Sequence, residues 1–346
     1  MSARRSTMKD VAALAGVSPK TVSNVITGAA AVRGQTRERV ESAMRELDFV
    51  PNLSARGLRN GRTGVIGVAL PDLATAFSAS LTKMIVELAH DRGLVVQIEE
   101  TSADPSREFA LVSRARTHLI DGLILNSITL EDSVVEHVGH LPPVVLIGEV
   151  EQHRADRVYI DSRGAAARMT AHVLGQGARR VAVIGGGTHG TEGNATSKLR
   201  VQGHLDALAA AGIDADPALQ LPDVSWTISG GAEGMRSLLE RGTPFDAVVA
   251  FTDSMALGAL QALYAEGVRV PEDVLIAGFD DVEHASFTHP PLSTISFDLR
   301  AYVAAALDLL SSRFADRSRA PQAVEVPYSL VPRESTAARP RGTNGK

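Results

Sequence analysis

Residues 8–26 read MKDVAALAGVSPKTVSNVI, a pattern that predicts two short helices joined by a tight turn. Gly16 suits the turn, because glycine adopts a positive φ without a Cβ clash. Ser18 is a favoured N-cap and Pro19 a favoured first residue for the second helix. The first helix is expected to pack through four apolar side chains, Val11, Ala12, Leu14 and Ala15.

The second helix is expected to turn Val22 and Val25 inward. The residues left outside lie near its start: Pro19, Lys20, Thr21, Ser23 and Asn24. An ordinary pair of helices has the same outline, but a helix-turn-helix presents such residues to base edges in the major groove. A third helix over 36–47, with Val40, Met44 and Leu47 on one face, is expected to close the core. Together these features favour a DNA-reading head.

Charge is distributed unevenly along the 346 residues, whose formal net charge is −5. Residues 1–62 hold eleven basic and five acidic side chains, and the remainder holds 24 basic and 35 acidic ones. A basic head on an acidic body concentrates the attraction for phosphate at one end.

The chain contains no cysteine, which excludes disulfides, cysteine–zinc sites and thiol nucleophiles. Arg4 and Arg5 are not followed by an apolar stretch long enough for a signal peptide. No apolar run reaches the roughly 18 residues of a membrane helix. We therefore expect a soluble, cytoplasmic, nucleoid-associated protein.

From residue 64 onward, short apolar runs alternate with segments of helical length. Continuous runs are typical of strands buried on both faces of a parallel sheet, and their alternation with helices predicts doubly wound α/β architecture. The expected strands are 65–70, 94–98, 122–125, 144–147, 181–184, 247–251 and 274–279. The expected helices are 77–92, 105–118, 164–176, 196–211, 230–241 and 253–266.

Roughly 260 residues exceed one such core, so two lobes are expected. A ligand would then bind between them, beyond the carboxyl ends of the strands. The predicted domains are a helix-turn-helix head at 1–50, a linker at 51–62, a first lobe at 63–162 and 294–324, a second lobe at 163–293 and 325–335, and a disordered tail at 336–346.

The linker PNLSARGLRNGR at 51–62 has two interpretations. Asn52 suits the cap of a short helix, but Gly57 costs that helix about 1 kcal/mol. So few residues do not sustain an isolated helix in water. The segment is either a flexible basic linker or one that becomes helical on DNA.

Several motifs follow one another along the chain. They are DVAALAGVSPKTVS at 10–23, TRERV at 36–40, LDFVPN at 47–52, ARGL at 55–58, GVALPD at 67–72, KLRVQG at 198–203, DSMALGA at 253–259, GFDD at 278–281 and PLSTI at 291–295. Together they resemble the lactose-repressor/galactose-repressor family of bacterial transcription regulators, over about residues 7–334.

The resemblance implies a homodimer whose heads bind a near-palindromic operator, as a repressor. It places Pro19, Lys20 and Asn24 at base edges, where Lys20 would donate to guanine and Asn24 would pair with adenine. Several members have arginine in place of Asn24, so the base read there differs. The residues placed at phosphates are Ser18, Thr21, Ser23 and Arg33.

The resemblance also extends to the linker. Leu58 matches a leucine that wedges into the minor groove at the operator centre and kinks the duplex. Asn52, Ala55 and Arg56 are similar to the neighbours of that leucine.

The resemblance further implies periplasmic-binding-protein-like lobes that hold a small effector, a sugar or a sugar-like molecule. Arg200 and Asp280 match effector-contacting positions, and this pair suits hydroxyl-rich ligands or a ligand carboxylate. Asp253 either contacts the ligand or only caps the helix that starts at Ser254. Trp226 either stacks on a sugar or lies in the core. The predicted effector set is Phe77, Arg200, Trp226, Thr252, Asp253 and Asp280.

Two departures from the family pattern qualify these expectations. Where some sugar-binding members have aspartate after the fourth strand, this chain reads Gly148-Glu149, so one hydroxyl contact is missing or moved. The tail from Arg333 lacks leucine heptads, which favours a dimer over a tetramer.

Other patterns in the sequence do not indicate a nucleotide, metal or catalytic site. The Gly185-Gly-Gly run lacks the Lys and Ser/Thr of a P-loop, and His137 and His140 fit a solvated helix face better than a metal site. His284 and His289 have no accompanying GxSxG or HExxH motif. We expect no catalytic residue, metal, cofactor or membrane partner. A solute-binding protein or a sugar-metabolising enzyme with the same lobes is the alternative.

The sequence leaves open the effector, the operator, the target genes and the use of a protein coregulator. Effector binding is expected to close the cleft and change the spacing of the two linkers, with a coupling of typically 1–3 kcal/mol. An inducer would separate the linkers, and a corepressor would bring them together.

Overall fold

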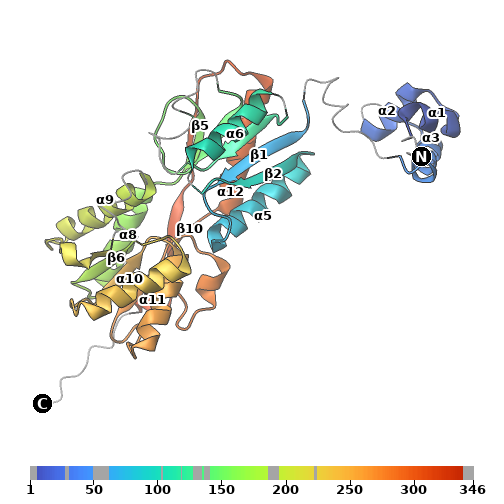
Figure 1. The fold of residues 1–346 in the computed structure, drawn as a ribbon. Coiled ribbons are helices and arrows are strands. Elements are labelled where there is room, and N and C mark those ends of the chain that lie inside the picture. The colour runs from blue at the N-terminus through green and yellow to red at the C-terminus, as the bar shows by residue number, and fades with distance from the viewer. Residues whose placement is uncertain are drawn as a thin grey trace, which may run out of the picture. The chain divides into compact units, whose positions relative to one another are not determined.

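The computed structural model describes residues 6–27, 31–49, 62–102, 104–117, 119–127, 135, 141–185, 195–221 and 224–337. The chain divides into two compact units, Met1–Thr63 and Gly64–Lys346, and each is described by itself. Figure 1 shows the helices of the first unit and the helix-covered sheets of the second.

The first unit contains three helices among its described residues, α1 (Met8–Ala15), α2 (Pro19–Thr27) and α3 (Gly34–Glu46). Thr7 and Asp10 form a capping box at the start of α1, with the Thr7 N–H donating to the Asp10 carboxylate at 2.8 Å. Gly16 ends α1 with φ 62°. Ser18 caps α2, because its hydroxyl accepts a hydrogen bond from the Thr21 N–H at 3.1 Å.

The core of this unit matches the predicted pattern except at Leu14. Val11, Val22 and Val40 are fully buried, and Met44 and Leu47 pack against them. Leu14 was expected in the core, but 45% of it is exposed. The expectation was wrong because the short α1 buries only the narrow stripe that contains Val11, Ala12 and Ala15.

The second unit begins with a parallel sheet of order β11-β5-β4-β3-β1-β2. Its strands are β1 (Val65–Leu70), β2 (Val95–Glu100), β3 (Gly122–Leu125), β4 (Val144–Ile147), β5 (Asp156–Tyr159) and β11 (Ala323–Glu325). The helices that pack on it are α5 (Ala76–Asp91), α6 (Pro105–Arg116) and α12 (Leu299–Ala315). This layered body is termed the amino-terminal lobe.

A second parallel sheet of order β7-β6-β8-β9 forms the carboxyl-terminal lobe. Its strands are β6 (Val181–Ile184), β7 (Gln220–Leu221), β8 (Ala247–Ala250) and β9 (Leu275–Ala277). Its helices are α8 (Ser162–Gly175), α9 (Ala195–Ala210), α10 (Ile228–Glu240) and α11 (Asp253–Ala265), with 3-10 turns η1 (Pro217–Leu219) and η2 (Glu283–Ser286). Strands β6 and β8 are fully buried, as expected for a sheet covered on both faces.

The chain passes between the two lobes three times within the described residues. It leaves β5 for α8, returns through β10 (Thr294–Phe297) to α12, and leaves again from β11 through β12 (Tyr328–Val331) to the turn η3 (Glu334–Thr336). Strands β10 and β12 pair antiparallel. One cluster of buried apolar residues runs through both lobes, so the lobes share a core at these crossings.

Helices α10 and α11 cross at very short range because glycine stands at the contact. A Cβ atom on Gly258 would overlap the carbonyl oxygen of Ile228 and lie 2.6 Å from the backbone nitrogen of Ala232. This close approach fixes α11, at whose first turn two of the predicted site residues stand.

Candidate functional site

The predicted DNA-reading residues lie on the outer face of the first unit. Pro19 and Lys20 are exposed, and Thr21, Ser23 and Asn24 are half-buried along the first turns of α2. Ser18 is exposed, but its hydroxyl is already hydrogen-bonded to Thr21, at 3.0 Å to the Thr21 hydroxyl. Arg33 is exposed and immediately precedes α3. The start of α2 is therefore accessible to a groove.

The predicted linker residues Asn52, Ala55, Arg56 and Leu58 lie outside the described residues. Their roles stay predictions.

In the second unit, the predicted effector residues Thr252 and Asp280 lie where strands of the carboxyl-terminal lobe end, and Glu149 lies where a strand of the amino-terminal lobe ends. Gly148 and Glu149 follow β4, Phe251 and Thr252 follow β8, and Phe279 and Asp280 follow β9. Carboxyl ends of parallel strands are the usual ligand edge of a doubly wound sheet. The site therefore lies between the two lobes.

Arg200, on α9, is the centre of this site and is only 5% exposed. Its Nη1 donates to the carbonyl oxygen of Phe251, and its Nε donates to the Ser162 hydroxyl at 3.3 Å. The guanidinium carbon lies 3.4 Å from the centre of the Phe279 ring, a cation–π contact. Burial lowers the pKa of Arg200, and the charges of Asp280, Glu149 and Asp253 oppose this shift.

Asp280 lies close to the Arg200 guanidinium, after strand β9. It follows β9 with φ 107°, is half-buried, and no donor among the described residues is hydrogen-bonded to its carboxylate. Burial raises its pKa well above the ordinary value, while the charge of Arg200 lowers it. A guanidinium beside an accepting carboxyl offers both donors and acceptors to hydroxyl groups.

Glu149 is held by the protein itself. Its carboxylate accepts hydrogen bonds from the Ser162 hydroxyl at 2.9 Å and from the Thr196 hydroxyl at 2.6 Å. Thr196 belongs to α9 of the carboxyl-terminal lobe, whereas Glu149 follows β4 of the amino-terminal lobe. Glu149 therefore links the lobes across the site. Nothing in the sequence spacing indicated Ser162 or Thr196 as its partners.

Asp253 does not cap α11, which was one of the two roles considered for it. Helix α11 begins at Asp253, and its N-cap is Thr252, whose hydroxyl accepts the Met255 N–H at 3.1 Å. Asp253 is fully buried, and its carboxylate accepts hydrogen bonds from the Thr294 hydroxyl at 2.7 Å and the Val282 N–H at 2.9 Å. With both oxygens bonded inside the protein, Asp253 holds the loop after β9 to strand β10. The cap assignment was wrong, and a direct ligand contact by this buried carboxylate stays a prediction.

Burial raises the pKa of Asp253 to about 7. Because this value exceeds the ordinary 3.8 of an unfolded chain, the folded protein binds a proton more tightly than the unfolded chain between those values. Raising the pH through that window therefore removes stability, on the order of 4 kcal/mol.

Asp253→Asn is expected to remove this pH dependence. The amide oxygen accepts from Val282 and the amide nitrogen donates to the Thr294 hydroxyl, so the local bonds survive without a titrating group. Urea unfolding of both proteins at about pH 5 and about pH 7 measures the effect. Wild-type stability should fall relative to the variant at the higher pH. Equal changes in the two proteins would contradict the raised pKa.

Aromatic residues flank the site from both lobes. Trp226 is half-buried, and its ring centre lies 5.7 Å from the Arg200 guanidinium carbon. Phe77, at the start of α5, packs its ring 6.1 Å from Phe297, which lies 5.4 Å from Tyr302. Trp226 is thus partly in the core and partly beside the site, and both of its interpretations stay open. Phe279, whose ring lies against the Arg200 guanidinium, is a site aromatic that the sequence did not single out.

The histidines and the glycine run considered in the sequence form neither a metal site nor a phosphate loop among the described residues. In the part of the chain that the structure describes, no group of three or more His, Asp or Glu residues is arranged to hold a metal ion. His137 and His140 lie outside the described residues, as do the two glycines after Gly185. None of the described helices is long and apolar enough to cross a membrane.

Two parts of the chain match known protein families. Residues 7–52 match the family model of bacterial regulatory proteins, lacI family, and residues 170–336 match that of a periplasmic binding protein-like domain. The HTH-type transcriptional repressor CytR of Escherichia coli (strain K12) is 33% identical over 292 residues, 84% of each chain.

Two known structures are similar over nearly the whole chain. The transcriptional regulator CelR in complex with cellobiose is 30% identical, with a TM-score of 0.71, covering 96% of this chain and 100% of that one. The lac repressor dimer bound to operator and the anti-inducer ONPF is 27% identical, with a TM-score of 0.81, covering 96% and 99%.

Proposed function

The chain belongs to the lacI family of bacterial regulatory proteins, and from this premise we propose a repressor that binds a near-palindromic operator as a homodimer. A small hydroxyl-rich effector between the lobes sets its affinity for the operator. The observation that carries the proposal is the proximity of the Arg200 guanidinium and the Asp280 carboxyl, whose charges act on each other beside Glu149 of the amino-terminal lobe. The protein acts at the nucleoid in the cytoplasm and is not an enzyme.

The first unit supports the DNA-binding part of the proposal. The turn between α1 and α2 is closed by Gly16, and the start of α2 presents Pro19, Lys20 and Asn24 outward. Lys20 and Asn24 read bases, while Ser18, Thr21, Ser23 and Arg33 bind phosphates. Asn52, Ala55, Arg56 and Leu58 bind the minor groove at the operator centre.

Fluorescence anisotropy with DNA from upstream of the protein's own gene tests operator binding. We expect tight, sequence-dependent binding whose affinity decreases with salt. Binding that is equally weak for a scrambled duplex would contradict the proposal.

Lys20→Ala is expected to weaken operator binding by about 1–3 kcal/mol and to relax the preference at one base pair, because it removes a donor to guanine. Anisotropy against single-base operator variants measures this. Lys198→Ala is the matched control, since Lys198 is an exposed lysine on α9 of the other unit. A uniform loss across all sequences would assign Lys20 to a phosphate instead.

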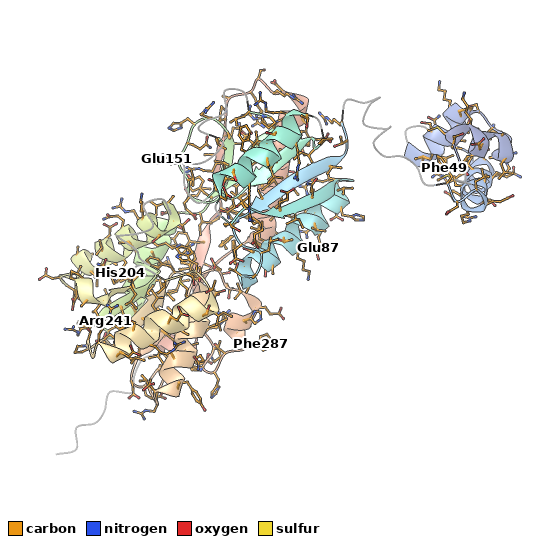
Figure 2. All side chains as sticks on the ribbon, in the orientation of Figure 1. Phe49, Glu87, Glu151, His204, Arg241 and Phe287 are labelled. Carbon is orange, nitrogen blue, oxygen red and sulfur yellow. The ribbon has the colours of Figure 1, made fainter. Side chains whose placement is uncertain are left out.

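In the proposed homodimer, a second copy of the chain covers apolar groups that are exposed along one side of the second unit. Strand β2 is a sheet edge, where Val95 is 53% exposed, and Val86 on the adjacent α5 is 41% exposed. In the carboxyl-terminal lobe, Phe287 is 79% exposed. Figure 2 shows Glu87 of α5 and Phe287 on the same side of the unit. Open edges and large exposed apolar groups are typical of interfaces.

The effector is proposed to be a sugar or a sugar derivative. The guanidinium of Arg200 and the carboxyl of Asp280 bind hydroxyl groups, Trp226 and Phe77 pack on apolar faces of the ring, and Thr252 and Asp253 support the loops around it. The structure of the similar regulator CelR is a complex with cellobiose.

A thermal-shift panel of sugars, sugar phosphates and nucleosides tests the identity of the effector, because a true ligand raises the melting temperature with its concentration. A panel without such a response would contradict a hydroxyl-rich effector.

Coupling to DNA is proposed to pass through the lobes. The bonds from Glu149 to Ser162 and Thr196 lie across the site, so a ligand that changes the lobe separation acts on them directly. The shift in operator affinity is limited by the difference in effector affinity between the two lobe arrangements.

A further inference from the structure

The loop after strand β9 carries Asp280, and two successive residues of this loop have positive φ angles. The angles are 107° at Asp280 and 51° at Asp281. This conformation is unfavourable for a residue that has a Cβ atom, and it persists only where surrounding contacts hold it. The loop that presents the Asp280 carboxyl is therefore held by bonds from other segments.

Three successive backbone N–H groups of the loop are hydrogen-bonded to such segments. The Asp280 N–H donates to a carbonyl oxygen of β10 at 2.9 Å, and the Asp281 N–H donates to the Thr294 hydroxyl at 3.3 Å. The Val282 N–H donates to the Asp253 carboxylate at 2.9 Å. These bonds hold the backbone of the loop against β10 and the start of α11.

The side chain of Asp281 is held by Arg333, which lies between β12 and η3. Nη2 of Arg333 donates to the Asp281 carboxylate at 2.6 Å, and Nη1 donates to the carbonyl oxygen of Leu292 at 2.7 Å. The two side chains of the pair are mostly buried, with 19% and 24% exposed. Because the guanidinium is planar and bonded in two directions, it fixes the orientation of its carboxylate partner.

The position of Arg333 is itself fixed through its backbone. Its N–H donates to the Ser293 hydroxyl oxygen at 2.8 Å, and its carbonyl oxygen accepts from the same hydroxyl at 3.0 Å. Two residues further on, the Ser335 hydroxyl donates to the carbonyl oxygen of Ile276 on β9 at 2.6 Å. Ser293 and Ser335 are fully buried. Arg333 therefore reaches Asp281 from a rigid base, where the chain has just crossed between the lobes for the third time.

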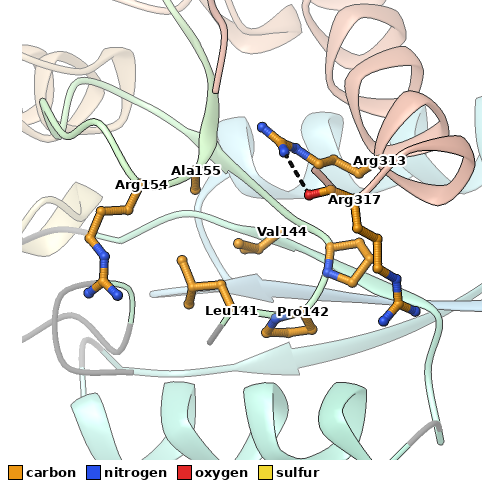
Figure 3. Close-up of a pocket in the computed structure, with 8 residues that line it drawn as sticks. Leu141, Pro142, Val144, Arg154, Ala155, Arg313 and Arg317 are labelled. Carbon is orange, nitrogen blue, oxygen red and sulfur yellow. Dashed lines mark hydrogen bonds between the residues drawn. The ribbon is translucent and has the colours of Figure 1, made fainter. Parts of the chain in front are cut away.

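Arg313, in the amino-terminal lobe, makes the same kinds of contact away from the candidate site. It pairs with Asp156 at 2.6 Å. It also donates to the carbonyl oxygen of Arg317 at 3.3 Å, beside a cavity of about 320 Å³ (Figure 3). These bonds join α12 to β5 and to the chain that follows α12. The carboxylate partner of Arg333, in contrast, is the neighbour of Asp280 in the chain.

We propose that Arg333 is a positioning residue of the effector site. By holding the Asp281 side chain, it keeps the loop in its unfavourable conformation and so sets the direction of the Asp280 carboxyl beside Arg200. The part played in effector recognition rests on the proposed function, whereas the hold on the loop does not. Without Arg333 the loop loses the anchor of its second positive-φ residue, and the hydrogen bonds of its three N–H groups open more often.

Hydrogen–deuterium exchange of the full, ligand-free chain tests the hold on the loop. In Arg333→Met, whose side chain is of similar length but has no charge or donor, the N–H groups of 280–282 should exchange about tenfold faster or more. Arg333→Lys keeps a cation that reaches Asp281 and should restore most of the protection. Arg269→Met is the matched control, because Arg269 of the same lobe also pairs with an aspartate, Asp273, at 2.6 Å. It should leave exchange at 280–282 unchanged.

The position of the Asp280 carboxyl is measured by its pKa, through ¹³C NMR of the side chain. Burial raises this pKa, the charge of Arg200 lowers it, and the charges of Asp253 and Glu149 raise it. A carboxyl that leaves the site escapes all of these influences, so its pKa in Arg333→Met should move towards the ordinary value. The same pKa in both proteins would overturn the proposal.

A double variant separates positioning from a general loss of stability. In Asp281→Ala, where Arg333 has lost its carboxylate partner, adding Arg333→Met should not speed exchange at 280–282 further. Unchanged exchange in Arg333→Met, no recovery in Arg333→Lys, or a further tenfold increase in the double variant would each overturn the proposal. Equal loss of protection throughout β9 and α11 would assign Arg333 a purely structural role. A thermal-shift panel without any response would contradict the proposed function and leave these exchange results as they stand.

Discussion

Gly258→Ala is expected to destabilise the carboxyl-terminal lobe by about 3 kcal/mol or more. The added methyl group would overlap the carbonyl oxygen of Ile228 and approach the backbone nitrogen of Ala232 to 2.6 Å. Both atoms belong to the backbone of α10, so no flexible side chain is able to move aside. Helices α10 and α11 would have to separate and lose the packing between them. Urea unfolding followed by circular dichroism measures the loss.

The control for this substitution is Gly175→Ala, at the end of α8. A Cβ on Gly175 meets no atom within 4 Å, so alanine there is expected to change stability by less than about 1 kcal/mol and to favour the helix. The comparison separates the effect of close helix packing from that of adding a methyl group to any helical glycine. Similar changes in both variants would mean that α10 and α11 are not in such close contact.

The local structure of the first unit could be predicted from sequence because its signals lie within a few residues of one another. Gly16 and Ser18 stand at the turn between α1 and α2 as expected. The capping box of Thr7 and Asp10 was not predicted, although the two residues have the spacing that such a box requires. The predicted burial of Leu14 was wrong because burial depends on which other helices contact α1, and that is not a local property.

The strands, too, could be predicted where the signal is local. Strands β1, β3, β4 and β6 have the predicted bounds, because each is a continuous apolar run. Strand β5, which reads Asp-Arg-Val-Tyr, was missed. Its aspartate is buried only because Arg313, 157 residues away in sequence, pairs with it. A charged residue inside a sheet is explained by its partner, and the sequence does not identify that partner.

The candidate site also contains features that the sequence predicted and contacts that it did not predict. The motif resemblance predicted that Arg200 and Asp280 belong to one site. In the structure they are close enough for the charge of each to affect the pKa of the other. The resemblance did not predict that Glu149 would bond Ser162 and Thr196, or that Asp253 would hold Val282 and Thr294. These bonds connect segments from different lobes or loops, and their formation depends on the final positions of the backbone.

Arg200→Ala is expected to abolish the response of operator binding to the effector while leaving operator binding itself unchanged. Arg200 is oriented by Phe251, Ser162 and the Phe279 ring, so its remaining donors have a fixed direction. Two hydrogen bonds from a charged group contribute about 3 kcal/mol or more, and their loss weakens effector binding by about 100-fold or more. Titration calorimetry with a ligand from the thermal-shift panel measures binding, and anisotropy measures the response of the operator complex.

The loss of Arg200 also removes the cation that faces Asp280 and Glu149. Removing a buried cation that faces carboxylates leaves their charges less compensated, so the melting temperature of the variant should fall, and binding must be measured well below it. Arg200→Lys separates the two effects, because lysine keeps the charge but lacks the planar fork of donors. It should recover much of the stability and little of the effector affinity. If Arg200→Ala instead binds the effector and releases the operator as the wild type does, Arg200 is a structural residue and the effector lies elsewhere.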